Sequence, residues 1–385
     1  MPAFPPEIEF LLHCLRRSLR SQDSPPHGSP EPPLAIPGGL DWSALLALAE
    51  THRILAIVYP QLAPYAPEEL STAWRAAWVH SQLLAAELES LLSGFALSGI
   101  EVLPLKGPVL AEALYGDIAA RQSVDLDLLV RPQDYSAAKA LLLASGFTTG
   151  SQPSTGYHWA YFREGTMVEL HTHLGPLGHC PLNVEEIWSR SGIAAFREQP
   201  IRVMPEEDRT LFLCYHLLKH HCARLIWIAD LSRALALLEK NGSGESLLKT
   251  AQCQGLERLL LSACAVVRET LGTPLPSELA AAILKQPKIA RSARSFIHLK
   301  LSGLSAPLLY PKLWIAPAKI ERGPWRLWRR LALFAPNLRD RGWAESHRIP
   351  GPLLTPLLPV LRLLRLLGKY GFVRALKIFL FRLRG

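Results

Sequence analysis

Paired cysteines and long apolar runs are both missing from this chain of 385 residues. The six cysteines are scattered and form no CxxC pair, which argues against a disulfide framework and favours a reducing compartment. No uncharged apolar stretch reaches about 18 residues, so the sequence predicts no membrane-spanning helix. Arg16, Arg17 and Arg20 interrupt the apolar residues near the N-terminus, and no secretory signal is predicted. We therefore expect a cytoplasmic protein.

Three motifs of common enzyme classes are also absent. The chain has no GxSxG element of a serine hydrolase, no GxGxxG fingerprint of a dinucleotide-binding fold and no Walker A phosphate loop. Their absence argues against hydrolase, dehydrogenase and P-loop activities.

Charge is distributed unevenly over the chain. Residues 291–385 contain 19 Lys/Arg against 3 Asp/Glu, a local net charge of +16 within an overall +9. The first 290 residues are correspondingly acidic, with a net charge of −7. A basic terminal quarter predicts peripheral contact with an anionic membrane surface or with nucleic acid through residues 291–385. The alternative is a buried helical pair with a solvated arginine rim.

The length predicts several domains or subdomains. Residues 1–98 are expected to form a helical N-terminal arm, with helices over 7–20, 41–51 and 67–98 and a Pro-rich linker over 21–39. Asp41 is the expected N-cap of the second helix. Residues 205–303 are expected to form a helical subdomain that begins at Pro205, and residues 304–385 a basic region that contains prolines, tryptophans and helix.

The sequence pattern changes over residues 99–204 and predicts a mixed α/β core. Short apolar strands are expected over 100–105 and 124–130, and helices over 109–115 and from Pro132 to Gly146. Segments 157–162 and 166–174 predict a hairpin around Glu164-Gly165.

Acidic residues on these strands are the candidate catalytic and metal-binding groups. Side chains i and i+2 of a strand share a face, so Asp125 and Asp127 project together at a Cα spacing of roughly 6–7 Å. Glu169 and His171 share a face of a second strand for the same reason. If the two strands are neighbours, three carboxylates converge, and a divalent cation would relieve their repulsion.

A turn before these strands supplies candidate phosphate ligands. Lys106 and Gly107 lie between a strand and a helix, where a glycine lets backbone amides approach a phosphate and a lysine adds positive charge. Arg121 lies four residues before Asp125 and can reach either a triphosphate or a carboxylate, in which case it forms a structural salt bridge. Pro108 follows Gly107 and has no N–H to donate.

The order Leu-Lys106-Gly107, Arg121-x-x-x-Asp125-Leu-Asp127 and Val-Glu169-Leu-His171 resembles uncharacterised bacterial nucleotidyltransferases of the DNA polymerase β-like superfamily. The segments from Phe212 to His220 and from Arg224 to Asp230 resemble the helical part of that family. The resemblance implies an α+β fold, with a mixed-sheet nucleotidyltransferase core flanked by the helical arm and the helical C-terminal region. It implies that Asp125 and Asp127 bind Mg²⁺ (or Mn²⁺), and that Glu169 completes the metal site or activates the acceptor.

The expected activity is transfer of a nucleoside monophosphate from an NTP to a hydroxyl or phosphate of an unidentified acceptor. That acceptor can be a small molecule, a peptide, a protein or RNA. Lys106, Gly107, Arg121, His171 and His220 are the candidate nucleotide ligands.

Three alternatives stay open. His216 and His220 are i, i+4 on a predicted helix, a spacing that can bind zinc. The chain can instead be a non-catalytic helical adaptor that binds a membrane or a protein through its basic end. The Asp-x-Asp element also occurs in glycosyltransferases that use nucleotide sugars.

Overall fold

A computed structural model describes residues 5–21, 32–150, 156–175 and 180–301. Much of the predicted linker over 21–39 and the whole basic region over 304–385 lie outside these residues. The division of the chain into four parts stays a prediction. None of the helices in the described part of the chain is long and apolar enough to cross a membrane.

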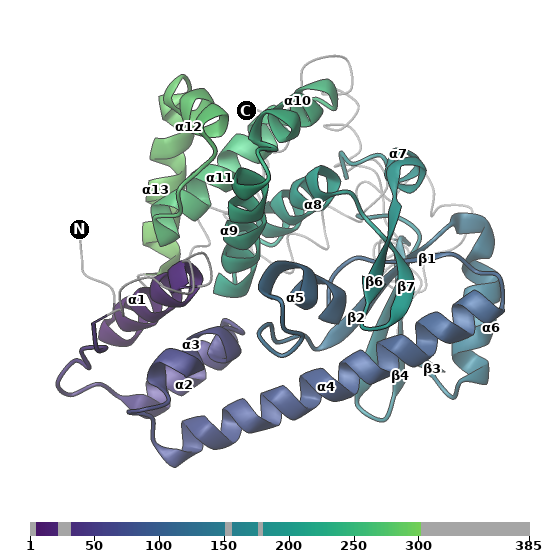
Figure 1. Ribbon diagram of the computed structural model, residues 1–385, viewed down its shortest axis with the longest axis horizontal. Helices are drawn as coiled ribbons and strands as arrows, with labels where there is room; N and C mark the ends of the chain where they lie inside the picture. The colour runs from purple at the N-terminus through teal and green to yellow at the C-terminus, as the bar shows by residue number, and fades with distance from the viewer. Residues whose placement is uncertain (1–4, 22–31, 151–155, 176–179, 302–385) are drawn as a thin grey trace, which may run out of the picture.

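The secondary structure combines helices with short strands (Figure 1). The helices are α1 (Pro6–Ser21), α2 (Trp42–Thr51), α3 (Leu55–Leu62), α4 (Glu68–Leu97), α5 (Pro108–Tyr115), η1 (Pro132–Asp134), α6 (Tyr135–Ala144), α7 (Val184–Arg190), α8 (Glu206–Lys219), α9 (Leu225–Lys240), α10 (Gly244–Cys253), α11 (Glu257–Leu271), α12 (Ser277–Leu284) and α13 (Pro287–Leu301). The strands are β1 (Val102–Pro104), β2 (Asp125–Val130), β3 (Thr148–Thr149), β4 (His158–Arg163), β5 (Thr166–His171), β6 (Gly192–Phe196) and β7 (Gln199–Val203).

A mixed sheet of five strands forms the centre, in the order β1-β2-β5-β4-β3. β2 and β5 pair in parallel, and the other neighbours pair antiparallel. β4 and β5 form the predicted hairpin, in which both Glu164 and Gly165 have positive φ, as a tight two-residue turn requires. The predicted α+β fold is confirmed.

One face of this sheet is covered by α4 and α6. Leu84, Leu88 and Phe95 of α4 pack with Leu126 and Leu128 of β2 in a single buried cluster. α4 continues past the sheet toward α2 and α3, so it links the sheet to the helical part of the molecule (Figure 1).

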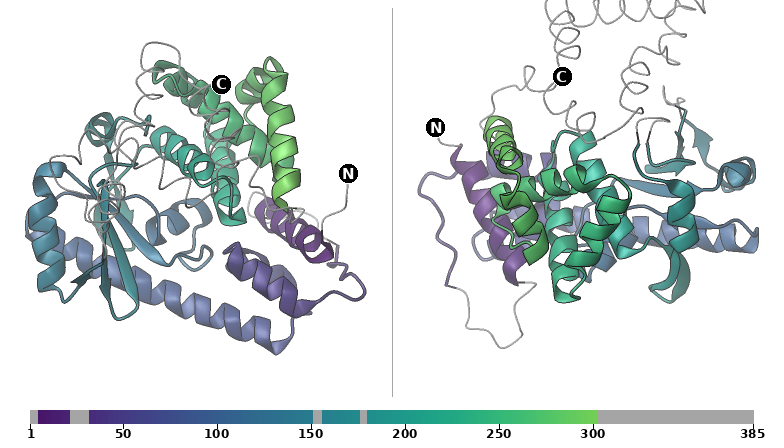
Figure 2. Two further views of the ribbon diagram at one scale, coloured as in Figure 1. Left: turned by 180° about the vertical axis from the view of Figure 1, so that it is seen from behind. Right: turned by 90° about the horizontal axis from the view of Figure 1, so that it is seen from above.

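The helical part has its own core, which joins segments distant in sequence. Buried residues of α1 and α3 share a hydrophobic cluster with those of α8, α9 and α11. α1 lies beside α9 and α11, so the first helix of the chain packs on the C-terminal helices (Figure 2).

Local signals fix several of the helix boundaries. Asp41 caps α2, because its carboxylate accepts hydrogen bonds from the backbone N–H groups of Ser43 and Ala44 at 2.9 and 3.0 Å. α8 begins directly after Pro205 with Glu206, Glu207 and Asp208 in its first turn. Both boundaries confirm the predictions from the sequence.

Candidate functional site

The acidic residues of β2 and β5 meet on one face of the sheet. In the parallel ladder, Asp125 is opposite Met167 and Asp127 is opposite Glu169. Leu126 and Leu128 point to the other face and are about 1% exposed, so the alternation directs the aspartates away from the core. The two acidic strands are neighbours, which is the condition that the sequence analysis set for their carboxylates to converge.

His171 connects two of these carboxylates. Its Nε2 lies 3.1 Å from Oδ1 of Asp127 and 3.4 Å from Oε2 of Glu169. Asp127 and His171 are both buried, whereas Glu169 is partly exposed. The structure therefore places His171 on the carboxylates, and its predicted contact with a nucleotide stays a prediction.

Lys106 supplies the positive charge on the other side of Asp127. Its Nζ lies 3.0 Å from Oδ2 of Asp127 and donates a hydrogen bond of 3.1 Å to Nε2 of His216 on α8. The lysine follows β1 at the turn into α5, where the sequence places it. This ammonium group thus joins the sheet to the helical part.

Gly107 lets that turn lie directly against β2. Its φ is +74°, and a Cβ at this position would lie 3.6 Å from the backbone oxygen of Asp125. Pro108 occupies the first position of α5, where its missing N–H costs no helical hydrogen bond. The turn consequently offers one amide fewer to a phosphate than a turn without proline.

The two aspartates have opposite protonation tendencies. Burial alone would raise the pKa of Asp127, but Lys106 and His171 outweigh it and hold that pKa well below its usual range. Burial and the adjacent charge of Asp127 raise the pKa of Asp125, against the opposing effect of Lys106. Asp127 is the carboxylate whose charge the protein stabilises with its own groups.

The same contacts shift the groups on β5. The hydrogen bond from His171 lowers the pKa of Glu169, against the effect of burial. Burial opposes protonation of His171, but the hydrogen bonds to Asp127 and Glu169 raise its pKa. Burial and repulsion from His171 lower the pKa of His158 to about 4.

The donor set fits a divalent cation. Asp127, Glu169 and His171 each offer one ligand atom, and these atoms lie within 4.8 Å of one another. Two carboxylate oxygens and an imidazole nitrogen suit Mn²⁺, and carboxylates with phosphate oxygens and water suit Mg²⁺. Asp125 lies outside this group of three but projects from the same face of β2. Its predicted role as a metal ligand stays a prediction.

Arg121 takes the second of its two predicted roles. Its Nε donates to both carboxylate oxygens of Asp230 on α9 at 2.9 and 3.0 Å, and its Nη1 donates to Ser123. Tyr115 donates a further hydrogen bond to Asp230. Arg121 and Asp230 are 5% and 1% exposed, so this is a buried structural salt bridge. The contact of Arg121 with a nucleotide stays a prediction.

The histidines of the predicted zinc pair lie near the site without forming a group of three ligands among the described residues. His216 directs its Nε2 toward Lys106, and burial and the charge of Lys106 lower its pKa well below the usual value. His220 follows the end of α8, with its ring 4.6 Å from that of His216 and 5.2 Å from that of Trp227. The binding of a nucleotide by His220 also stays a prediction.

His158 belongs to the site although the sequence analysis did not include it. It is directly opposite His171 in the β4–β5 ladder, and their rings stack at 5.0 Å. Its Nε2 lies 3.9 Å from Oε1 of Glu169. The sequence does contain a signal for this position, because a two-residue turn at Glu164-Gly165 sets the register that pairs residues 158 and 171.

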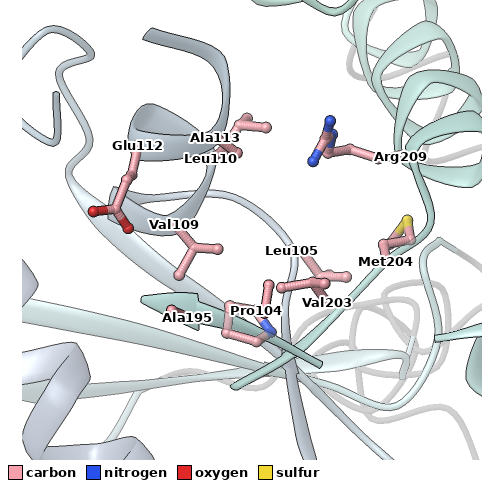
Figure 3. Close-up of a pocket in the computed structure, with 11 residues that line it drawn as sticks. Pro104, Leu105, Val109, Leu110, Glu112, Ala113, Ala195, Val203, Met204 and Arg209 are labelled. Carbon is pink, nitrogen blue, oxygen red and sulfur yellow. The ribbon is translucent and has the colours of Figure 1, made fainter. Parts of the chain in front are cut away.

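A pocket of about 230 Å³ lies next to this site, between β1, α5, the β6–β7 hairpin and α8 (Figure 3). Pro104, Leu105, Val109 and Val203 are among the apolar side chains that line it. Glu112 and Arg209 lie on opposite sides of the pocket in Figure 3. None of the carboxylates of β2 and β5 lines it.

No curated protein matches the chain. A solution structure of the antibiotic-resistance factor ANT(2'')-Ia is similar with a TM-score of 0.34 and 13% identity, over 45% of this chain and 94% of that chain. A crystal structure of ANT(2'')-Ia in complex with adenylyl-2''-tobramycin is similar with a TM-score of 0.34 and 14% identity, over 44% of this chain and 97% of that chain.

A family model matches residues 38–272, which include the sheet, the carboxylates, Lys106 and the helices that carry His216 and Asp230. The match covers more than half of the chain. The protein therefore belongs to the family described as uncharacterised nucleotidyltransferase, and it is an enzyme of the nucleotidyltransferase class.

Proposed function

We propose that this enzyme transfers a nucleoside monophosphate from an NTP to an acceptor hydroxyl or phosphate at the carboxylates of β2 and β5, and that the reaction depends on Mg²⁺ or Mn²⁺. The observation that carries the proposal is the direct pairing of Asp127 with Glu169 in adjacent parallel strands, with Asp125 on the same face. In the reaction, an acceptor oxygen forms a bond to the α-phosphorus, the bond between that phosphorus and the β-phosphate oxygen breaks, and pyrophosphate leaves.

In this proposal, Asp125, Asp127 and Glu169 hold the cation, which neutralises phosphate charge when it is bound. His171 keeps Asp127 and Glu169 oriented through its hydrogen bonds. Glu169 is more exposed than Asp127 and His171, and it is the group that can also accept the proton of the acceptor hydroxyl.

Lys106 and the Gly107 turn bind phosphate oxygens. The Lys106 side chain is 15% exposed and its ammonium group lies on Asp127, so the lysine is available at the surface of the carboxylate cluster. As a point charge with three donors, a lysine can contact a carboxylate, a histidine and a phosphate oxygen together.

The first test measures nucleotide binding by thermal denaturation with Mg²⁺ and each NTP. We expect at least one NTP to raise the melting temperature of the wild type and to have little effect on Asp127→Asn. UDP- and GDP-sugars form a separate arm: stabilisation by a nucleotide sugar and by no NTP would contradict the proposal.

The second test measures pyrophosphate release with the stabilising NTP and three acceptor pools: small molecules, RNA, and peptides with proteins. We expect one pool to support release in a manner that requires Mg²⁺ or Mn²⁺. If no pool supports release although an NTP binds, transfer to an acceptor of these classes is excluded.

A further inference from the structure

Two loops from distant parts of the chain meet beside the carboxylates. One joins α2 to α3 and carries Arg53, and the other joins α8 to α9 and carries Arg224. The backbone N–H of Ile226 donates a hydrogen bond of 3.2 Å to the backbone oxygen of His52. This hydrogen bond links the two loops directly, and the charge of Arg224 acts on Arg53.

Arg53 occupies a backbone position that normally belongs to glycine. Its φ is +55°, and the two hydrogen bonds of a Schellman ending surround it: Arg53 N–H to the oxygen of Glu50 and Ile54 N–H to the oxygen of Ala49, both at 2.9 Å. Glycine is the preferred residue at this position, because a side chain there is strained. The way in which the helix ends therefore does not explain why an arginine occupies this position.

The second loop is strained in the same way. His221 and Cys222 have φ values of +56° and +50°. Five non-glycine residues of the described chain have positive φ, and two of them, Glu164 and Arg197, lie in hairpin turns. The other three all lie in these two facing loops, and strain of this kind concentrates at functional sites.

Neither arginine has a carboxylate partner in the described part of the chain. The guanidinium of Arg224 lies 5.5 Å from the ring centre of Trp227, and Arg53 forms no ion pair with any residue that the structure describes. Burial and then the charge of Arg224 lower the pKa of Arg53, while Asp125 opposes this shift. The repulsion between the two guanidinium groups thus exceeds the attraction of Arg53 to Asp125.

The arginine pair lies at the border of the carboxylate cluster. The negative charges of Asp125 and Asp127 both act on Arg53 and favour its charged form. Trp227, under Arg224, packs edge-on against His216 at 5.0 Å, and His216 accepts the hydrogen bond of Lys106. A ligand that reaches from the carboxylates toward these loops would thus encounter positive charge.

We propose that Arg53 and Arg224 form a phosphate-binding pair that holds the terminal phosphates of the nucleotide, while its α-phosphate lies at the carboxylates. The inference rests on the proposed function, since it assigns a further part of the same site. A multiply charged phosphate group between the guanidinium groups would remove their repulsion and form charge-assisted hydrogen bonds with both. A phosphorylated acceptor offers the same chemistry and is distinguished below.

The unusual backbone of Arg53 provides a sharp variant. Arg53→Gly removes the guanidinium and also relieves the left-handed strain, so the fold should be retained with an equal or higher melting temperature. Arg224→Gln removes the second charge with a side chain of similar reach. Arg197→Gly is the matched control, because Arg197 has φ +54° in the β6–β7 turn and its side chain pairs with Glu89.

Calorimetric titration of the full chain in Mg²⁺ with inorganic tripolyphosphate, the stabilising NTP and the matching NMP tests the pair. We expect Arg53→Gly and Arg224→Gln each to weaken tripolyphosphate and NTP binding by about tenfold or more, the usual effect of losing a charged hydrogen bond. NMP binding should change by less than about twofold, and Arg197→Gly should bind all three ligands like the wild type.

The possible outcomes separate this inference from the proposed function. If both variants bind tripolyphosphate and NTP as tightly as the wild type does, the proposed phosphate-binding pair is overturned. It is also overturned if the wild type binds no tripolyphosphate. If the two variants lose affinity as expected but the protein releases no pyrophosphate, the result supports the inference and counts against the proposed function. If the variants lose affinity for tripolyphosphate but keep that for NTP, the nucleotide assignment is overturned in favour of a phosphorylated acceptor.

Discussion

Asp127 of β2 and Glu169 of β5 are register partners in neighbouring parallel strands, and His171 bridges their carboxylates. Two carboxylates held this closely repel each other unless positive charge lies between or beside them. The protein supplies some of that charge with Lys106 and His171. The rest of the negative charge of the cluster, including that of Asp125, can be neutralised by a bound cation, which can also bind phosphate oxygens.

Neutralising either partner should abolish most of the activity. We expect Asp127→Asn and Glu169→Gln each to lower the rate of pyrophosphate release by about 100-fold or more, because each removes a charge that positions the phosphates. Glu239→Gln, an exposed change near the end of α9, is the control. Activity within twofold of wild type in both site variants would exclude this cluster as the catalytic centre.

Divalent cations should stabilise the folded protein through the same residues. A cation present at 100 times its dissociation constant adds about 2.7 kcal/mol to the free energy of unfolding. We expect Mg²⁺ or Mn²⁺ to raise the melting temperature of the wild type after EDTA treatment, and to raise it much less in Glu169→Gln. An equal rise in both proteins would mean that the cation binds elsewhere.

The Arg121–Asp230 salt bridge should matter for stability, because it links the loop before β2 to α9. Removing one member leaves a buried, unpaired charge, so Arg121→Met alone and Asp230→Leu alone should each lower the free energy of unfolding by about 3–5 kcal/mol. The double variant should lose much less free energy of unfolding than the two single variants lose together. Urea denaturation measures all three. A fully additive double variant would show that the pair does not act as a unit.

Local patterns predicted the elements that carry the site. The alternation of Asp125, Leu126 and Asp127 predicted β2, and the Glu164-Gly165 turn predicted the hairpin, because both signals lie within a few residues. The β6–β7 hairpin escaped prediction, since β6 is a short strand with four of its five residues exposed and has no clear alternation.

Long-range partners were the part that the sequence could not predict. The parallel pairing of β2 with β5 depends on a crossover of more than 30 residues, and Asp230 meets Arg121 from 109 positions away. Tertiary packing decides such contacts. Arg53 was missed for a related reason: its importance appears only once α2 ends at Thr51 and the next loops meet.

His216 should make stability depend on pH. Its pKa in the folded protein lies well below 6.5, its ordinary value in the unfolded chain, because of burial and Lys106. The unfolded chain therefore binds more protons below pH 6.5, so the stabilisation is complete above that pH and decreases as the pH falls, by at most about 1.4 kcal/mol per pH unit. His216→Gln should show a shallower loss between pH 6.5 and 5 in denaturant titrations, and an unchanged slope would contradict this assignment.

Thiol reactivity should report on the packing of the helical part. Cysteine reacts as the thiolate, and burial raises the pKa of Cys14 and Cys264 to about 12, which leaves about one thiol in ten thousand ionised at pH 8. Cys214 and Cys222 are also buried, whereas Cys253 is exposed and Cys180 partly exposed. Titration with a chromogenic disulfide should therefore detect two fast thiols in the native protein and all six in denaturant. Fast reaction of Cys14 or Cys264 would mean that the contact of α1 with α11 opens in solution, because both thiols belong to the cluster that these helices share.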